Sequence, residues 1–232
     1  MELKIIAKIH TDFPTKFGLP RQGGLVEGLC GTIVFEKEYQ NPDALRGLED
    51  FSHIWLIWGF SEGFASDKTD NKTWSPTVRP PRLGGNRRMG IFATRSPNRP
   101  NPLALSCVKI EAIENTVSSG CVIHVSGIDM MDGTPIYDIK PYLPHTECIH
   151  EAKGGFAKTA ANHYLTVECP PQIIEKIPEE KRDALIATLS EDPRPSYQND
   201  PEREYGFPFA GFEVKFKVDG DILTVTEIEK IK

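Results

Sequence analysis

Alternating apolar and polar positions recur through the first 130 residues and predict β-strands. Residues 1–10 alternate in this way, and strand-forming residues return across Leu25–Glu36. Phe51–Phe60 is an almost continuous apolar run, which is typical of a central strand. Two further alternating segments, Ala104–Ile113 and Gly120–Ile128, are close enough along the chain to form a hairpin. The first part of the chain is therefore predicted to be a multi-stranded sheet.

Helical signals are fewer. Asn41–Phe51 predicts a short helix, because Asn41 suits the N-cap and Pro42 the first helical position. Pro170–Asp192 predicts a second helical segment with its leucines on one face. After it, alternating residues from Phe212 lead through an Asp-Gly turn into Ile222–Ile228, a clear hairpin signal.

These elements never alternate as strand, helix and strand, which argues against a parallel α/β sheet. We expect a mainly β protein in which residues 1–160 form a small, mostly antiparallel barrel or sandwich. Residues 161–232 are predicted to form a small α+β C-terminal domain.

Composition narrows the class of protein. Hydrophobic residues make up 39% and charged residues 26%, which is typical of a globular protein. No apolar run is long enough to span a bilayer, and the N-terminus lacks a signal-peptide core. The five cysteines are odd in number and form no CxxC pair, so we expect reduced thiols in a cytoplasmic protein and no metal site.

Charge is distributed unevenly. The net charge is −6, yet the segment from Asn71 to Ile110 contains eight bases and no acid. A basic segment on an acidic body attracts polyanions to one place, as in phosphate binding. A solvated loop is the alternative explanation, but forty residues without an acid favour the first.

The centre of that segment is the loop Met89–Ser106, MGIFATRSPNRPNPLALS. Its prolines exclude a helix and hold the backbone extended or turned, so Arg95 and Arg99 are carried on a rigid loop. Preformed loops of this kind lower the entropic cost of binding. The alternative is a structural turn with solvated arginines.

Common catalytic motifs are absent: the sequence has no GxSxG, HExxH or strand-linked GxGxxG. What remains is a set of loops shaped by proline and glycine, at Leu19–Gln22, Ser61–Glu62, Arg95–Leu105 and Asp132–Pro135. Such loops suit the binding of a small polar molecule through backbone groups, although Asp132–Pro135 alone would read as a plain β-turn.

Several of these segments resemble the TsaA-like family, which contains bacterial tRNA adenine-N6 methyltransferases. The resemblance spans both predicted domains in order and is carried by LPRQ at Leu19–Gln22, RGLEDFSHIWLIWGF at Arg46–Phe60, VRPPRLGGNRRMGIFATRSPNRPNP at Val78–Pro102, MDGTPIYDIKPYLP at Met131–Pro144 and DPRPSY at Asp192–Tyr197.

The resemblance implies a small β-barrel enzyme that uses S-adenosyl-L-methionine, without the glycine fingerprint of a doubly wound sheet. It implies methylation of the exocyclic N6 amine of threonylcarbamoyladenosine at position 37, beside the anticodon of threonine tRNA. It also implies a homodimer with the cofactor near the subunit interface. The cofactor-binding residues carried over by motif are Pro20, Arg21, Gln22, Ser61, Glu62, Arg95, Leu105, Asp132, Gly133, Thr134 and Pro135.

Two further sets of residues follow from combining this resemblance with the chemistry. Asp138 and Tyr142 are candidates for accepting the amine proton, with an ion pair between Asp138 and Lys140 as the alternative role for that carboxylate. The expected contacts to tRNA phosphates are Arg79, Arg82, Arg87, Arg88 and Arg99. Two other functions stay open: a non-catalytic RNA-binding barrel, and an enzyme of the same scaffold acting on a small molecule.

Overall fold

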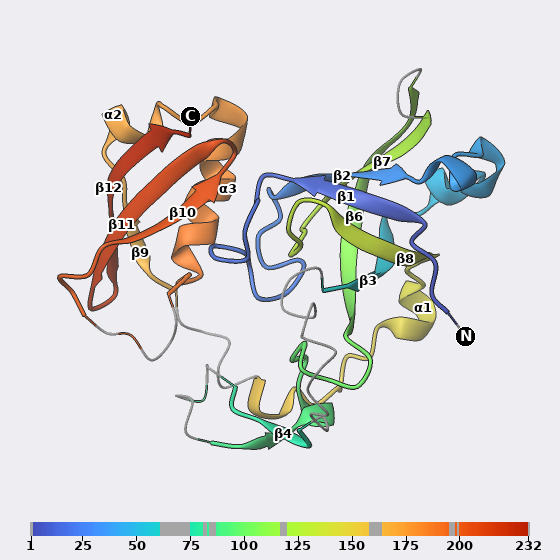
Figure 1. The fold of residues 1–232 in the computed structure, drawn as a ribbon, viewed down its shortest axis with the longest axis horizontal. Coiled ribbons are helices and arrows are strands. Elements are labelled where there is room, and N and C mark those ends of the chain that lie inside the picture. The colour runs from blue at the N-terminus through green and yellow to red at the C-terminus, as the bar shows by residue number, and fades with distance from the viewer. Residues whose placement is uncertain are drawn as a thin grey trace, which may run out of the picture.

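The computed structural model shows a closed antiparallel barrel followed by a smaller sheet with helices (Figure 1). The residues it describes are 2–60, 75–80, 83, 87–116, 120–157, 164–194, 198 and 200–231. The barrel order is β1-β2-β7-β6-β3-β8. The strands are β1 (Ala7–Thr11), β2 (Cys30–Phe35), β3 (His53–Gly59), β6 (Leu103–Thr116), β7 (Gly120–Ser126) and β8 (Thr134–Pro141).

Alternation along these strands fills the interior of the barrel. Ile9, Ile33, Leu56, Ile123 and Ile136 are completely buried, and each comes from a different strand. Their neighbours in sequence point outward, as the period of two in a strand requires. The mainly β class is confirmed, and of the two predicted architectures the structure has the barrel.

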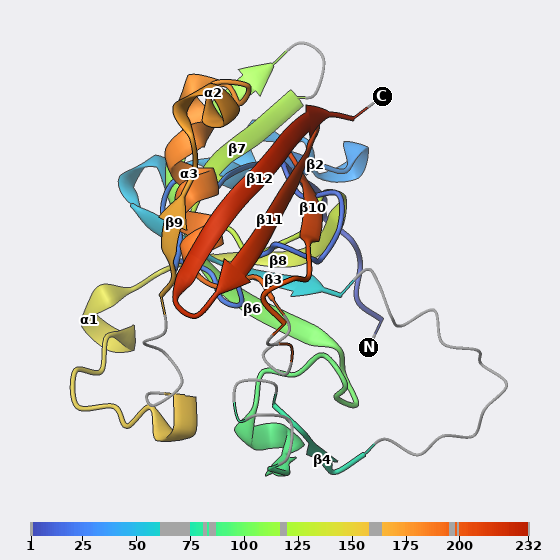
Figure 2. The same cartoon turned by 90° about the vertical axis from the view of Figure 1, so that its left-hand side faces the viewer.

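The C-terminal sheet has the order β10-β11-β12-β9, in which β9 is parallel to β12. Figures 1 and 2 show α3 lying against one face of this sheet, on the side that faces the barrel. The predicted hairpin is confirmed as β11 and β12. The elements are β9 (Thr166–Glu168), α2 (Pro171–Ile174), α3 (Glu179–Ser190), β10 (Tyr205–Phe209), β11 (Phe212–Asp219) and β12 (Ile222–Lys230).

The long loop between β1 and β2 joins the two parts. The ring of Phe13 packs edge-on against Phe209 with the centroids 5.2 Å apart. Gly18 passes so close to Phe207 that a Cβ there would lie 2.4 Å from the ring, so this position requires glycine. Asp12 forms an ion pair with Lys181 of α3. The loop that follows β1 is therefore folded against the C-terminal sheet as well as the barrel.

Both predicted helices are interrupted. The segment Asn41–Phe51 contains two 3-10 helices, η2 (Pro42–Leu45) and η3 (Leu48–Asp50), separated by Gly47 with φ +86°. The predicted N-cap is present, because the Asn41 side chain accepts a hydrogen bond from the Asp43 backbone N–H. In Pro170–Asp192, Pro178 lies between α2 and α3 and prevents one continuous helix.

The strand β8 is the main element that the sequence pattern missed. The sequence predicts only a turn at Asp132–Pro135. That turn is present, with Gly133 at φ +74°. From Thr134 the chain continues as a strand that pairs with both β1 and β3 and closes the barrel.

The remaining elements are short. They are η1 (Lys37–Tyr39), β4 (Thr77–Val78), β5 (Met89–Gly90), η5 (Ile91–Ala93), α1 (Pro144–Glu147) and η6 (Gly155–Ala157). Within the described part of the chain, no helix is long and apolar enough to cross a membrane.

Candidate functional site

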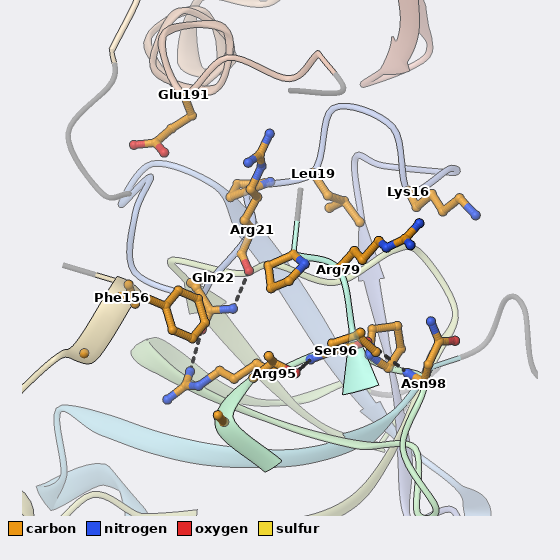
Figure 3. A pocket seen from close by; sticks show the side chains of 18 of the residues that line it. Lys16, Leu19, Arg21, Gln22, Arg79, Arg95, Ser96, Asn98, Phe156 and Glu191 are labelled. Atoms are coloured by element: carbon orange, nitrogen blue, oxygen red, sulfur yellow. Dashed lines mark hydrogen bonds between the residues drawn. The ribbon is translucent and has the colours of Figure 1, made fainter. Parts of the chain in front are cut away.

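A pocket of about 1680 Å³ lies where four separate segments meet (Figure 3). The loop after β1 contributes 16–22, and the segment around β4, β5 and η5 contributes residues between 75 and 98. The C-terminal part contributes Thr188 and 191–194, and the η6 region contributes 153–157. The pocket is therefore formed by both the barrel loops and the C-terminal domain.

Three of the predicted cofactor-binding residues meet at this pocket. Arg95 donates a hydrogen bond from Nη1 to Gln22 Oε1 at 2.5 Å, and Gln22 Nε2 donates to the Arg21 carbonyl oxygen, also at 2.5 Å. Figure 3 shows this chain of contacts running from Arg21 to Arg95. Gln22 and Arg95, which are 73 positions apart in sequence, thus lie on one polar edge. Both belong to segments for which the family resemblance predicts cofactor binding. Pro20, which precedes them, is buried and also lines the pocket.

The loop that carries Arg95 is braced by its own polar groups. The Thr94 hydroxyl donates to the Ile91 carbonyl at 2.9 Å and accepts from the backbone N–H of Ser96 at 3.3 Å. Arg99 donates from Nη1 to the Thr94 carbonyl at 3.1 Å. The predicted loop is present, but its first part is not extended: Ile91–Ala93 forms the 3-10 helix η5 before the first proline, Pro97. The guanidinium of Arg99 is one of the groups that stabilise the loop. Contact of Arg99 with tRNA stays a prediction.

Basic side chains dominate the lining of the pocket. The acids among the lining residues are Glu191 and Asp192; the bases are Lys16, Arg21, Arg79, Arg88, Arg95, Lys153 and Arg194. Of the predicted RNA contacts, Arg79 and Arg88 are therefore here, while Arg87 is exposed outside the lining. Arg82, Ser61 and Glu62 fall outside the described residues.

Sequence reasoning assigned no role to Arg194, although it quoted the DPRPSY motif that contains it. The Arg194 side chain is 7% exposed and donates from Nε and Nη2 to the Asp192 carboxylate at 2.9 and 3.1 Å. Its carbonyl oxygen accepts a hydrogen bond from Arg21 Nη2 at 3.2 Å. The motif thus supports the predicted cofactor loop from the C-terminal domain.

The predicted segment Asp132–Pro135 lies elsewhere, at the turn into β8. Asp132 accepts a hydrogen bond from the Thr11 backbone N–H at 3.1 Å and lies 3.1 Å from the His10 ring nitrogen. Thr134 is 1% exposed. None of these residues lines the pocket.

Leu105, Asp138 and Tyr142 lie on the outer face of the barrel. The register places Leu105 opposite Ile57, and Ile57 opposite Asp138. Leu105, Ile57 and Asp138 therefore form a row across β6, β3 and β8. Leu105 is 46% exposed. Asp138 forms the ion pair with Lys140, at 2.9 Å, that was its alternative role. Within one chain these residues are separate from the pocket.

Tyr142 packs against aromatic neighbours on this face. Its ring contacts Trp55 and His53 at centroid distances of 5.8 and 6.4 Å. Desolvation raises the pKa of the Tyr142 phenol above its ordinary value, and nearby acidic groups act in the same direction. The hydroxyl is therefore protonated at neutral pH and can donate a hydrogen bond. A catalytic role for Asp138 or Tyr142 stays a prediction.

The described residues contain no group of three or more His, Cys, Asp or Glu side chains arranged to hold a metal ion. The described cysteines are unpaired, and burial raises the pKa of Cys30, Cys107 and Cys169.

Comparisons with known proteins identify the family of the chain. Residues 8–148 match the tRNA-methyltransferase O N-terminal domain, and residues 163–231 match the TrmO C-terminal domain. A "tRNA (adenine(37)-N6)-methyltransferase" of Escherichia coli is 37% identical over 221 residues, covering 92% of this chain and 91% of that protein.

Two further comparisons extend the match to a solved structure and to an archaeal protein. The crystal structure of TrmO from Pseudomonas aeruginosa superposes with a TM-score of 0.77 at 28% identity, covering 99% of this chain and 98% of that one. An "S-adenosyl-L-methionine-binding protein" of Archaeoglobus fulgidus is 32% identical over 154 residues, which cover 66% of this chain but 98% of the archaeal protein.

Proposed function

Because the chain belongs to the TrmO family, whose two domains match most of its length, we propose that it methylates tRNA. The proposed reaction transfers the methyl group of S-adenosyl-L-methionine to N6 of the adenine at position 37, in a threonylcarbamoyladenosine of threonine tRNA. The observation that carries this proposal is the basic pocket between both matched domains, with Arg21, Gln22 and Arg95 along one edge. We propose that the enzyme acts in the cytoplasm, where cysteines stay reduced.

The residues at the pocket fit the proposed cofactor. Its amino-acid carboxylate is best matched by a guanidinium, and Arg21 and Arg95 both lie at the pocket edge. Gln22 holds Arg95 in place, and the buried Pro20 fixes the loop in front of it. When bound, the cofactor supplies a methyl group on a sulfonium, which is an electrophile.

The size of the pocket fits two ligands. Sites for one small molecule occupy about 300–1000 Å³, and this pocket measures about 1680 Å³. The additional space suits a nucleotide that has left its stack, as enzymes acting on bases require. Arg79 and Arg88 on the same wall suit its phosphates.

Catalysis in this site rests mainly on orientation. Arg21, Gln22 and Arg95 would hold the cofactor, which would supply the electrophilic methyl group to N6, and N6 would give up its proton to a base of the protein. N6 is a weak nucleophile, so holding both partners in line supplies most of the acceleration, up to roughly 7–11 kcal/mol. Asp138, whose carboxylate pairs with Lys140 and accepts a hydrogen bond from the Ile139 backbone N–H, is the proposed proton acceptor.

We infer that the active form is a homodimer. Leu105 and Asp138 carry proposed roles but lie on the outer face of β3, β6 and β8, separate from the pocket of their own chain. A second copy resting on this face would bring one chain's Leu105 and Asp138 to the other chain's pocket. Trp55 and the exposed Leu105 give the face an apolar character suited to such a contact.

The deciding experiment supplies radiolabelled S-adenosyl-L-methionine and bulk tRNA that lacks the methyl group, followed by digestion to nucleosides. We expect label in one nucleoside, N6-methylated threonylcarbamoyladenosine, and no label when position 37 is guanine. Calorimetry with the cofactor alone addresses the alternatives: a chain that binds no cofactor would be an RNA-binding barrel. Labelling of a metabolite but of no tRNA would identify a small-molecule enzyme.

A further inference from the structure

A buried network of hydrogen bonds lies beneath the pocket edge. Trp58 donates from Nε1 to the Ser106 hydroxyl at 2.9 Å, and that hydroxyl donates to the Asp129 carboxylate at 2.6 Å. Trp58 is 6% exposed and Ser106 is 3% exposed. The backbone N–H of Gly23 donates to the same carboxylate. One carboxylate thus receives hydrogen bonds from two segments that are 83 positions apart.

Each member of the network is within three residues of a segment with a proposed cofactor role. Gly23 follows Gln22, and Ser106 follows Leu105. Asp129 stands three residues before Asp132, and Trp58 stands three residues before Ser61. A shift of this carboxylate would therefore be transmitted to several of these segments at once.

The backbone at Gly23 packs closely against the barrel, so a shift of the Asp129 carboxylate would change its position. A Cβ on Gly23 would lie 3.3 Å from the Gly127 carbonyl oxygen and 3.4 Å from that of Cys107. The next residue, Gly24, donates its N–H to the Gly127 carbonyl at 2.8 Å. The end of the cofactor loop is thus held against the barrel by main-chain contacts, with the Asp129 carboxylate as their side-chain partner.

We propose that Asp129 is a positioning residue, which anchors the loop Leu19–Gln22 to the barrel and so holds Arg21 and Gln22 in their binding geometry. The identity of the ligand rests on the proposed function, whereas the anchoring rests on the contacts alone. The carboxylate is well suited to this role, because it accepts both hydrogen bonds and attracts the guanidinium of Arg95.

Burial raises the pKa of Asp129, while the bonds from Ser106 and Gly23 and the charge of Arg95 oppose that rise. An asparagine keeps the shape but replaces one carboxylate oxygen with an NH2 group and removes the charge. In Asp129→Asn, the hydrogen bonds from Ser106 and Gly23 therefore lose their charged acceptor, and the attraction to Arg95 is lost. Hydrogen bonds to charged groups are stronger than those between neutral groups, and we expect the cofactor to bind about tenfold or more weakly.

The test compares Asp129→Asn with the wild type and with Asp50→Asn, a matched change at an exposed carboxylate of η3. Calorimetry measures cofactor affinity, and kinetics separate the KM for cofactor from the KM for tRNA. We expect a higher cofactor KM with an unchanged tRNA KM. Unchanged cofactor affinity in a folded Asp129→Asn protein would overturn the proposal.

Two readouts need no cofactor. The chain has three tryptophans, so the indole N–H resonance of Trp58 can be assigned and should shift in Asp129→Asn while that of Trp55 does not. Amide exchange at Gly23 and Gly24 should accelerate. If the wild type binds no cofactor, the proposed function fails, yet these readouts still decide the anchoring. If Asp129→Asn does not fold, Ser106→Ala replaces it, and unchanged exchange at Gly23 in that variant would overturn the proposal.

Discussion

The pocket edge and the outer face of β3, β6 and β8 both carry residues with proposed roles, yet they differ in kind. At the pocket edge Arg21, Gln22 and Arg95 contact one another within one chain. On the outer face Leu105 is exposed, and Asp138 pairs only locally with Lys140. The contacts along the first surface are made within a single chain, whereas in the proposed dimer the second surface is covered by another molecule. The comparison therefore separates the proposed cofactor edge from the proposed dimer contact, which also brings Asp138 to the other chain's pocket.

The largest effect is expected at the pocket edge. Arg95→Ala removes the guanidinium proposed to meet the cofactor carboxylate, and should lower kcat/KM for methylation by more than about a hundredfold. Arg95 is exposed, so the fold should survive, as circular dichroism would verify. Arg46→Ala, which removes another exposed arginine remote from the pocket, serves as the control. Full turnover by the Arg95 variant would refute the assignment of this edge.

A charge introduced on the outer face of β3, β6 and β8 tests whether that face forms the proposed dimer contact. Leu105→Glu should convert the proposed dimer to a monomer, because a carboxylate buried in an apolar contact lacks a partner. Light scattering measures the mass, and we expect methylation to fall by about tenfold or more as the second subunit is lost. Ile149→Glu changes another exposed apolar residue and should leave the mass unchanged. A Leu105→Glu protein with wild-type mass and activity would remove the argument for assembly on this face.

A smaller effect is expected from the arginines around the pocket. Arg88 lines it and donates to the Thr77 hydroxyl at 3.2 Å, whereas Arg87 is exposed outside the lining. Arg88→Ala should raise the KM for tRNA several-fold and reduce the salt slope of binding by about one, as expected for one phosphate contact. Arg87→Ala is the matched comparison and should have the weaker effect. Equal effects would mean that RNA binding extends beyond the pocket.

The sequence predicted those features that depend on local chemistry. Prolines predicted the braced loop around Arg95, and period-two alternation predicted the barrel strands and the C-terminal hairpin. It missed β8, because a turn signal at Asp132–Gly133 obscured the strand after it. It also missed Asp129 and Arg194, whose partners are brought near only by closure of the barrel and by docking of the C-terminal domain. No local pattern encodes a contact that tertiary structure creates.

The smallest effect is expected at Tyr142, and it separates two roles on the outer face. Burial raises the pKa of its phenol further above neutral pH, which favours a hydrogen-bond donor over a proton acceptor at this position. Tyr142→Phe keeps the ring contacts with Trp55 and His53 and should lower kcat by less than about twofold. Asp138→Asn removes the proposed acceptor and should lower kcat by about a hundredfold, the lower bound for losing general-base catalysis. Single-turnover methylation measures both variants, because it reports the chemical step apart from product release. A larger loss in Tyr142→Phe than in Asp138→Asn would transfer the proton-handling role from the carboxylate to the phenol.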